Sequence, residues 1–70
     1  MLLKDWRHLR GRTQEWLAEE TGIDQALISK YEHGVRPLVP NVRKIEAATG
    51  GEVTLEDWYP TGAKGEVKGG

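Results

Sequence analysis

The sequence predicts an all-α fold, a compact five-helix bundle that contains a helix-turn-helix. Apolar residues recur at the spacing of helices, and no segment sustains the alternation that marks a β-strand. Seventy residues make one domain at most, and we place it at residues 1–60. Residues 61–70 contain four glycines and one large apolar side chain, so we expect a disordered tail there.

The first helix is predicted from an apolar stripe that stops at Gly11. The members of this stripe are Leu2, Leu3, Trp6 and Leu9. The second helix starts after Thr13, a good N-cap, and reaches about Glu20. Gly22 supplies the left-handed residue that ends it.

A third helix follows closely, with Asp24 as its N-cap and its end at about Glu32. Two helices joined by so short a turn form a helix-turn-helix layout. Pro40 suits the first position of a fourth helix, which ends at the glycine pair 50–51. Its inward residues are predicted to be Val42, Ile45 and Ala48. A short fifth helix is predicted after Thr54, which has capping-box spacing to Asp57.

Composition excludes several classes of protein. The chain has no cysteine, which removes disulfides, thiolate metal sites and cysteine catalysis. No apolar run is long enough to span a membrane, and the start "MLLKDWRHLR" is too short in apolar residues for a secretory signal. We therefore expect a cytoplasmic protein without membrane association.

Catalysis and cofactor binding find no support in the motifs. There is no nucleophile elbow, and the glycine pair at 50–51 precedes no phosphate-binding lysine. His8 and His33 lack the spacing of metal ligands. We expect no enzyme, no cofactor and no metal site, and we expect His33 to lie at a groove edge or to cap carbonyls.

Charge alternates along the chain although the net value is only −1. Residues 1–12 and 25–44 are net basic, whereas residues 13–24 and 45–59 are net acidic. Such blocks can fold into one basic and one acidic face, and a polyanion responds to local potential rather than to the total. A mixed, solvated surface explains the same pattern equally well.

The third predicted helix has two chemically distinct faces. Leu27, Ile28 and Tyr31 fall on one face, which we expect to pack on the other helices. The opposite face carries an amide, a methyl, a hydroxyl, an ammonium and an imidazole without a carboxylate, from Gln25, Ala26, Ser29, Lys30 and His33. These side-chain types read base edges: glutamine reads adenine, lysine reads guanine, and alanine contacts the thymine methyl.

Nine residues occur at the spacing of a known family. They are Gln14, Leu17, Ala18, Gly22, Ile23, Ile28, Ser29, Glu32 and Gly34. The chain resembles the helix-turn-helix domain of phage repressors and Cro, the XRE family, from about Leu3 to Trp58. The later "KIEAATGGEVTLEDW" is similar to the close of small phage Cro-like proteins, which suggests a phage or prophage origin.

The resemblance implies that the third helix lies in the major groove of double-stranded DNA while the second crosses the backbone. It implies these base-proximal residues: Gln25, Ala26, Ser29 and Lys30. It implies these phosphate contacts: Gln14, Arg36, Asn41 and Arg43. It also implies a structural ion pair between Arg7 and Glu32. The sequence departs from the family at three positions, where Arg12 replaces an apolar residue, Leu27 replaces a small hydroxyl residue, and Asp24 places a carboxylate at the cap.

Two functions remain open from the sequence. The first is a Cro-like repressor that binds an inverted-repeat operator as a homodimer, and its interface candidates are Leu38, Val39, Trp58 and Tyr59. The second is an antitoxin-like or adaptor module that binds a protein partner, with weak or no DNA binding. Net acidity favours the second, as does Trp16, which we expect to be exposed on a partner surface. We expect Trp6 and Trp58 to pack in the core or an interface.

Overall fold

The computed structural model describes residues 1–60, and five helices account for the regular structure of that range. Their bounds are α1 Leu3–Arg10, α2 Gln14–Thr21, α3 Gln25–Glu32, α4 Val39–Ala48 and α5 Leu55–Trp58. No strand is present in residues 1–60, so the all-α prediction is confirmed. The predicted disordered tail, residues 61–70, lies outside the described residues. No helix of the described part is long and apolar enough to cross a membrane.

The ends of the helices follow from local chemistry. Thr13 caps α2 by accepting a hydrogen bond from the Trp16 amide at 3.0 Å, and Asp24 caps α3 by accepting one from the Ala26 amide at 3.0 Å. Gly22 ends α2 with a φ of 75°, a conformation that costs glycine little. These caps are where the sequence predicts them. Helix α4 begins at Val39, one residue before the predicted start, so Pro40 lies in its first turn.

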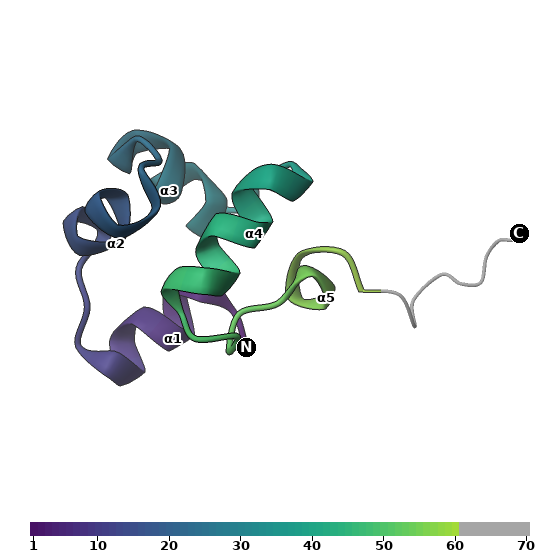
Figure 1. The fold of residues 1–70 in the computed structure, drawn as a ribbon, viewed down its shortest axis with the longest axis horizontal. Helices are drawn as coiled ribbons and strands as arrows, with labels where there is room; N and C mark the ends of the chain where they lie inside the picture. Colours follow the sequence, from purple (N-terminus) through teal and green to yellow (C-terminus); the bar gives the residue numbers. More distant parts are fainter. Residues whose placement is uncertain (61–70) are drawn as a thin grey trace, which may run out of the picture.

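Helices α2 and α3 lie side by side, and α4 lies next to them and runs toward α1 and α5 (Figure 1). One cluster of buried apolar side chains joins the five helices: Leu3, Trp6, Leu17, Ile23, Ile28, Tyr31, Val42, Ile45, Val53 and Trp58. Within it the rings of Tyr31 and Trp58 meet edge to face, with centroids 6.0 Å apart. The inward face of α3 is thus packed against α5 in the core.

Only two members of the apolar stripe of α1 reach the core. Leu2 and Leu9 are 58% and 63% exposed, whereas Leu3 and Trp6 are buried. The helix starts only at Leu3 and is eight residues long, so a single i, i+3 pair reaches the core.

The expectation for Trp16 needs correction, whereas Trp58 packs in the core, one of the two places expected for it. Trp16 is half-buried rather than exposed, because its ring packs on Trp6 with centroids 6.0 Å apart. Trp58 is only 8% exposed, because α5 turns its ring into the core beside Tyr31. Trp58 therefore contributes little to any dimer interface, although it was a candidate for one.

Candidate nucleic-acid interface

The outward face of α3 is available to a partner. Gln25, Ala26 and Lys30 are exposed, and Ser29 is half-buried. Within residues 1–60, none of these four side chains makes a hydrogen bond or an ion pair. On the opposite face Ile28 is fully buried. The four residues predicted to lie near bases therefore share one solvent-facing surface of α3.

A polar network anchors the C-terminal end of α3. Arg7 donates through Nε to Glu32 Oε2 at 2.7 Å and through Nη2 to Glu32 Oε1 at 3.0 Å. Gln14 Nε2 donates to the same Oε1 at 3.1 Å. The side chain of Glu32 is only 2% exposed, and that of Arg7 is 15% exposed. One carboxylate therefore joins α1 and α2 to α3.

The electrostatics of this network favour its charged form. The hydrogen bond to Glu32 raises the pKa of Arg7. Burial by itself would raise the pKa of Glu32, but the hydrogen bonds from Arg7 and Gln14 and the charge of Arg7 outweigh it and lower that pKa below the ordinary value. The ion pair therefore remains charged at neutral pH.

Two of the predicted phosphate contacts already hold internal partners. Gln14 uses one amide hydrogen on Glu32, and Asn41 Nδ2 donates to the Tyr31 hydroxyl at 2.8 Å. Both residues are half-buried. Each amide nitrogen carries a second hydrogen, so each side chain retains one donor for an outside acceptor.

The two predicted arginines differ from each other. Arg43 is exposed and pairs with Glu46 at 3.0 Å, a contact within one helical turn. Arg36 is exposed and lies over the ring of Tyr59, with its guanidinium carbon 5.7 Å from the ring centroid. The Tyr59 hydroxyl donates to the carbonyl of Pro37 at 2.7 Å, which holds that ring against the loop. Arg36 is thus the better-placed anion ligand of the two.

His33 lies at the C-terminal end of α3, as its C-cap residue. Its Nδ1 lies 2.7 Å from the carbonyl oxygen of Ser29, so the protonated nitrogen caps a carbonyl at the end of α3. No group of three His, Asp or Glu side chains in the described range is arranged to hold a metal ion.

The structure reveals one cluster that the sequence analysis did not assemble. The guanidinium carbon of Arg12 lies 4.6 Å from the centroid of the Trp16 ring. Trp6 beneath it donates through Nε1 to Glu52 at 2.6 Å, and Arg10 donates to both carboxylate oxygens of the same residue. The i, i+4 spacing of a cation and an aromatic residue was the available signal for the first pair.

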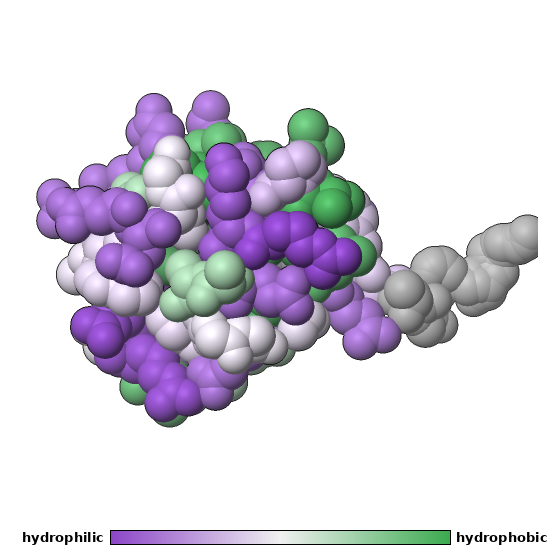
Figure 2. Space-filling view, viewed as in Figure 1, coloured by the Kyte–Doolittle hydropathy of each residue, from purple (hydrophilic) through white to green (hydrophobic). Residues whose placement is uncertain are grey.

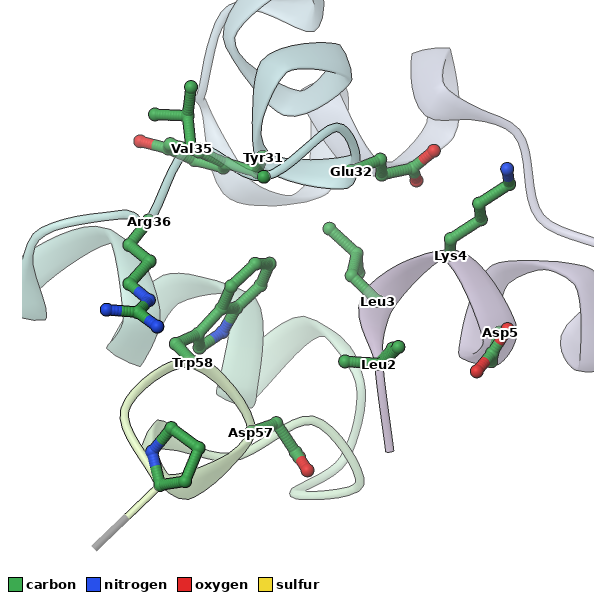
Figure 3. Close-up of a pocket in the computed structure, with 12 residues that line it drawn as sticks. Leu2, Leu3, Lys4, Asp5, Tyr31, Glu32, Val35, Arg36, Asp57 and Trp58 are labelled. Atoms are coloured by element: carbon green, nitrogen blue, oxygen red, sulfur yellow. The ribbon is translucent and has the colours of Figure 1, made fainter. Parts of the chain in front are cut away.

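A cavity of about 370 Å³ opens between α1, α3 and α5, where α3 contributes Tyr31 and Glu32 to the lining (Figure 3). Leu3 and Trp58 form apolar walls, while Lys4, Glu32 and Arg36 bring charged groups to its edge.

The fold and the outward face of α3 define a helix-turn-helix protein. A family model described as helix-turn-helix matches residues 3–57, and the chain belongs to this family, the XRE type of phage repressors and Cro. The protein is accordingly a DNA-binding regulator of the helix-turn-helix class. No curated protein and no solved structure matches the chain significantly.

Proposed function

We propose that the protein is a Cro-like repressor that binds an inverted-repeat operator as a dimer and represses by occluding a promoter. The observation that carries this proposal is the outward face of α3, which presents Gln25, Ala26, Ser29 and Lys30 without a carboxylate. An arginine-bound Glu32 fixes the opposite end of the same helix. A rigid helix with polar, non-acidic side chains suits insertion into the major groove.

The contacts divide into two kinds. Gln25, Ala26, Ser29 and Lys30 read base edges, with Lys30 suited to guanine and Gln25 to adenine. Arg36 contacts a phosphate from the loop after α3, and Gln14 contributes its second amide hydrogen from the start of α2. Asn41 and Arg43 are secondary phosphate contacts, because Asn41 already donates to the Tyr31 hydroxyl and Arg43 to Glu46.

Dimerisation is supported by an apolar surface that follows the outward face of α3, which we call the reading face. Val35, Leu38 and Val39 are 48%, 75% and 49% exposed and follow one another in the loop after α3 and the start of α4. Apolar residues gather over this part of the molecule at the upper right of Figure 2. Exposed apolar patches of this kind mark protein interfaces, and a two-fold dimer uses the same patch on both copies. Tyr59 lies half-buried beside it.

The test is selection of binding sites from a randomised duplex pool at ~150 mM salt with excess competitor DNA, since most non-specific affinity is lost at that salt. The proposal expects enrichment of an inverted repeat whose half-sites lie about one helical turn apart. Recovery of no motif, with retention only at low salt, would overturn it.

A second function is favoured by the exposed acidic surface of α2. Glu15, Glu19 and Glu20 are exposed on this helix, and the first two border a hollow beside Trp16 and Gln25. An acidic surface repels DNA and attracts basic protein segments. An adaptor or antitoxin-like module would use this surface, and the absence of any enriched DNA motif would support that function instead.

A further inference from the structure

The backbone of Arg12 is fixed in the loop between α1 and α2. Its amide donates to the Arg7 carbonyl at 2.9 Å, and its carbonyl accepts from Arg7 Nη1 at 3.1 Å. Gly11 before it has a φ of 66° and ends α1, and Thr13 after it caps α2. Arg12 is therefore an exposed residue on a rigid segment, and its side chain leaves a defined point of the surface.

The side chain of Arg12 rests on an aromatic platform. Its guanidinium carbon is 4.6 Å from the centroid of Trp16, and Trp16 packs in turn on the buried ring of Trp6. Stacking uses the flat face of a guanidinium and leaves the N–H groups at its edge free to donate. The platform therefore orients a charged donor before any partner arrives.

The arginines of the chain fall into two groups. Three form ion pairs with glutamates: Arg7 with Glu32, Arg10 with Glu52 and Arg43 with Glu46. The other two, Arg12 and Arg36, stack on Trp16 and Tyr59, and neither pairs with a carboxylate of residues 1–60. One of these unpaired arginines precedes α2 and the other follows α3, so they flank the helix-turn-helix along the chain.

The polar side chains next to Arg12 already use hydrogen-bonding groups on internal partners, so a charged donor here would be the stronger phosphate ligand. Gln14 gives one amide hydrogen to Glu32, and the Thr13 hydroxyl accepts from the Trp16 amide. A guanidinium forms stronger, charge-assisted and often bidentate hydrogen bonds to phosphate than a neutral amide does. We propose that Arg12, oriented by Trp16, binds a backbone phosphate of the DNA and is the principal phosphate ligand at the start of the helix-turn-helix. This inference rests on the proposed DNA-binding function.

The test compares wild type with Arg12→Gln on the selected operator over a range of salt concentrations. Loss of one phosphate contact in each protomer should lower the slope of log affinity against log salt by about 0.9 per protomer, or about 1.8 in magnitude for the dimer on its operator. It should weaken operator and random DNA alike, by about tenfold at ~150 mM salt. Arg10→Gln is the matched control, because it removes the same charge from an arginine that Glu52 already holds.

A second measurement identifies the phosphate. Operators are prepared with a neutral methylphosphonate at one backbone position at a time. The wild type should bind more weakly wherever the replaced phosphate is one that it contacts. At the phosphate bound by Arg12, the replacement should not weaken Arg12→Gln any further. Trp16→Phe should keep most of the affinity, whereas Trp16→Leu should lose part of it, with thermal unfolding as the check on folding.

The outcomes separate the two proposals. Wild type that binds no duplex under any salt condition refutes the proposed function itself. The Arg12 contact alone is refuted if wild type binds its operator but Arg12→Gln matches Arg10→Gln in slope and affinity, and every methylphosphonate that weakens wild type also weakens Arg12→Gln. The Arg12 contact is supported if one methylphosphonate position weakens wild type but not Arg12→Gln and the salt slope of Arg12→Gln is lower.

Discussion

The carboxylate of Glu32 is held by Arg7 through two hydrogen bonds of 2.7 and 3.0 Å, which ties the first helix to the last residue of α3. Gln14 adds a bond from α2 at 3.1 Å. Because these groups are almost out of solvent, the pair acts as a fixed joint rather than as a loose surface contact. The orientation of α3, and with it the reading face, depends on this joint.

Arg7→Leu should destabilise the protein by about 3 kcal/mol, because it leaves the buried charge of Glu32 without its partner. Urea denaturation followed by circular dichroism measures this change as a shift of the midpoint. The double variant Arg7→Leu/Glu32→Leu should recover much of the loss, since two apolar side chains leave no buried charge. A double variant less stable than Arg7→Leu would contradict this account.

Acid should destabilise the fold through carboxylates whose pKa is lowered in the folded state. Arg10 and Trp6 lower the pKa of Glu52 by hydrogen bonding. Burial would raise the pKa of Asp57, but bonds from the Met1 ammonium and Thr54 lower it overall. A lowered folded pKa contributes stability that is complete above the unfolded pKa, about 4, and is lost as pH falls through the folded value.

The melting temperature should therefore be nearly constant from about pH 7 to pH 5 and should fall below that range. Thermal unfolding at a series of pH values measures it. The variant Glu52→Gln should show a shallower fall, because one of the titrating groups is gone. A melting temperature unchanged down to pH 3 would show that these bonds do not contribute to stability.

The sequence was sufficient for the helix ends but not for every buried residue. Thr13, Asp24 and Gly22 act within their own turns, so their roles are legible without knowing the rest of the fold. Whether Leu9 or Trp16 is buried depends on which helix packs opposite, and the periodicity of one short helix does not decide it. Short helices worsen the problem, since few residues define the face.

Gly22→Ala should destabilise the protein by about 1 kcal/mol, because alanine is strained at a φ of 75°. A Cβ at this position would meet no atom within 4 Å, so the cost is conformational rather than steric contact. Gly22→Asn should cost less, since asparagine tolerates the left-handed region. Equal losses for the two variants in urea denaturation would argue against this explanation.

Lys30→Ala should relax base preference at one operator position by ~1 to 3 kcal/mol, because Lys30 is exposed on the reading face and has no partner within residues 1–60. Competition binding with operators changed at single positions measures the relaxation. Gln14→Ala should instead weaken all sequences together and should also lower the melting temperature, since Gln14 bonds Glu32. Equal loss on operator and random DNA for Lys30→Ala would make Lys30 a phosphate contact.

The candidate site was predictable where it depends on one helix. The outward residues of α3 follow from its period, and the structure exposes the same face. The partners of Gln14 and Asn41 lie 18 and 10 residues away, and no local pattern predicts them. The platform of Arg12 also needs Trp6 from another helix. Tertiary contacts therefore change the roles of side chains whose positions the sequence already indicates.

Leu38→Asp should convert the protein from dimer to monomer, because Leu38 is 75% exposed within the apolar surface that we propose as the interface. Sedimentation equilibrium at micromolar concentration should give about twice the 7.9 kDa chain mass for wild type and a single mass for the variant. Leu9→Asp is the matched control, since Leu9 is 63% exposed but lies on α1. The variant Leu38→Asp should also bind a half-site as well as wild type does while losing the advantage of the full inverted repeat. A wild type that sediments as a monomer both free and on DNA would refute dimerisation. Loss of the dimer in Leu9→Asp but not in Leu38→Asp would place the interface elsewhere.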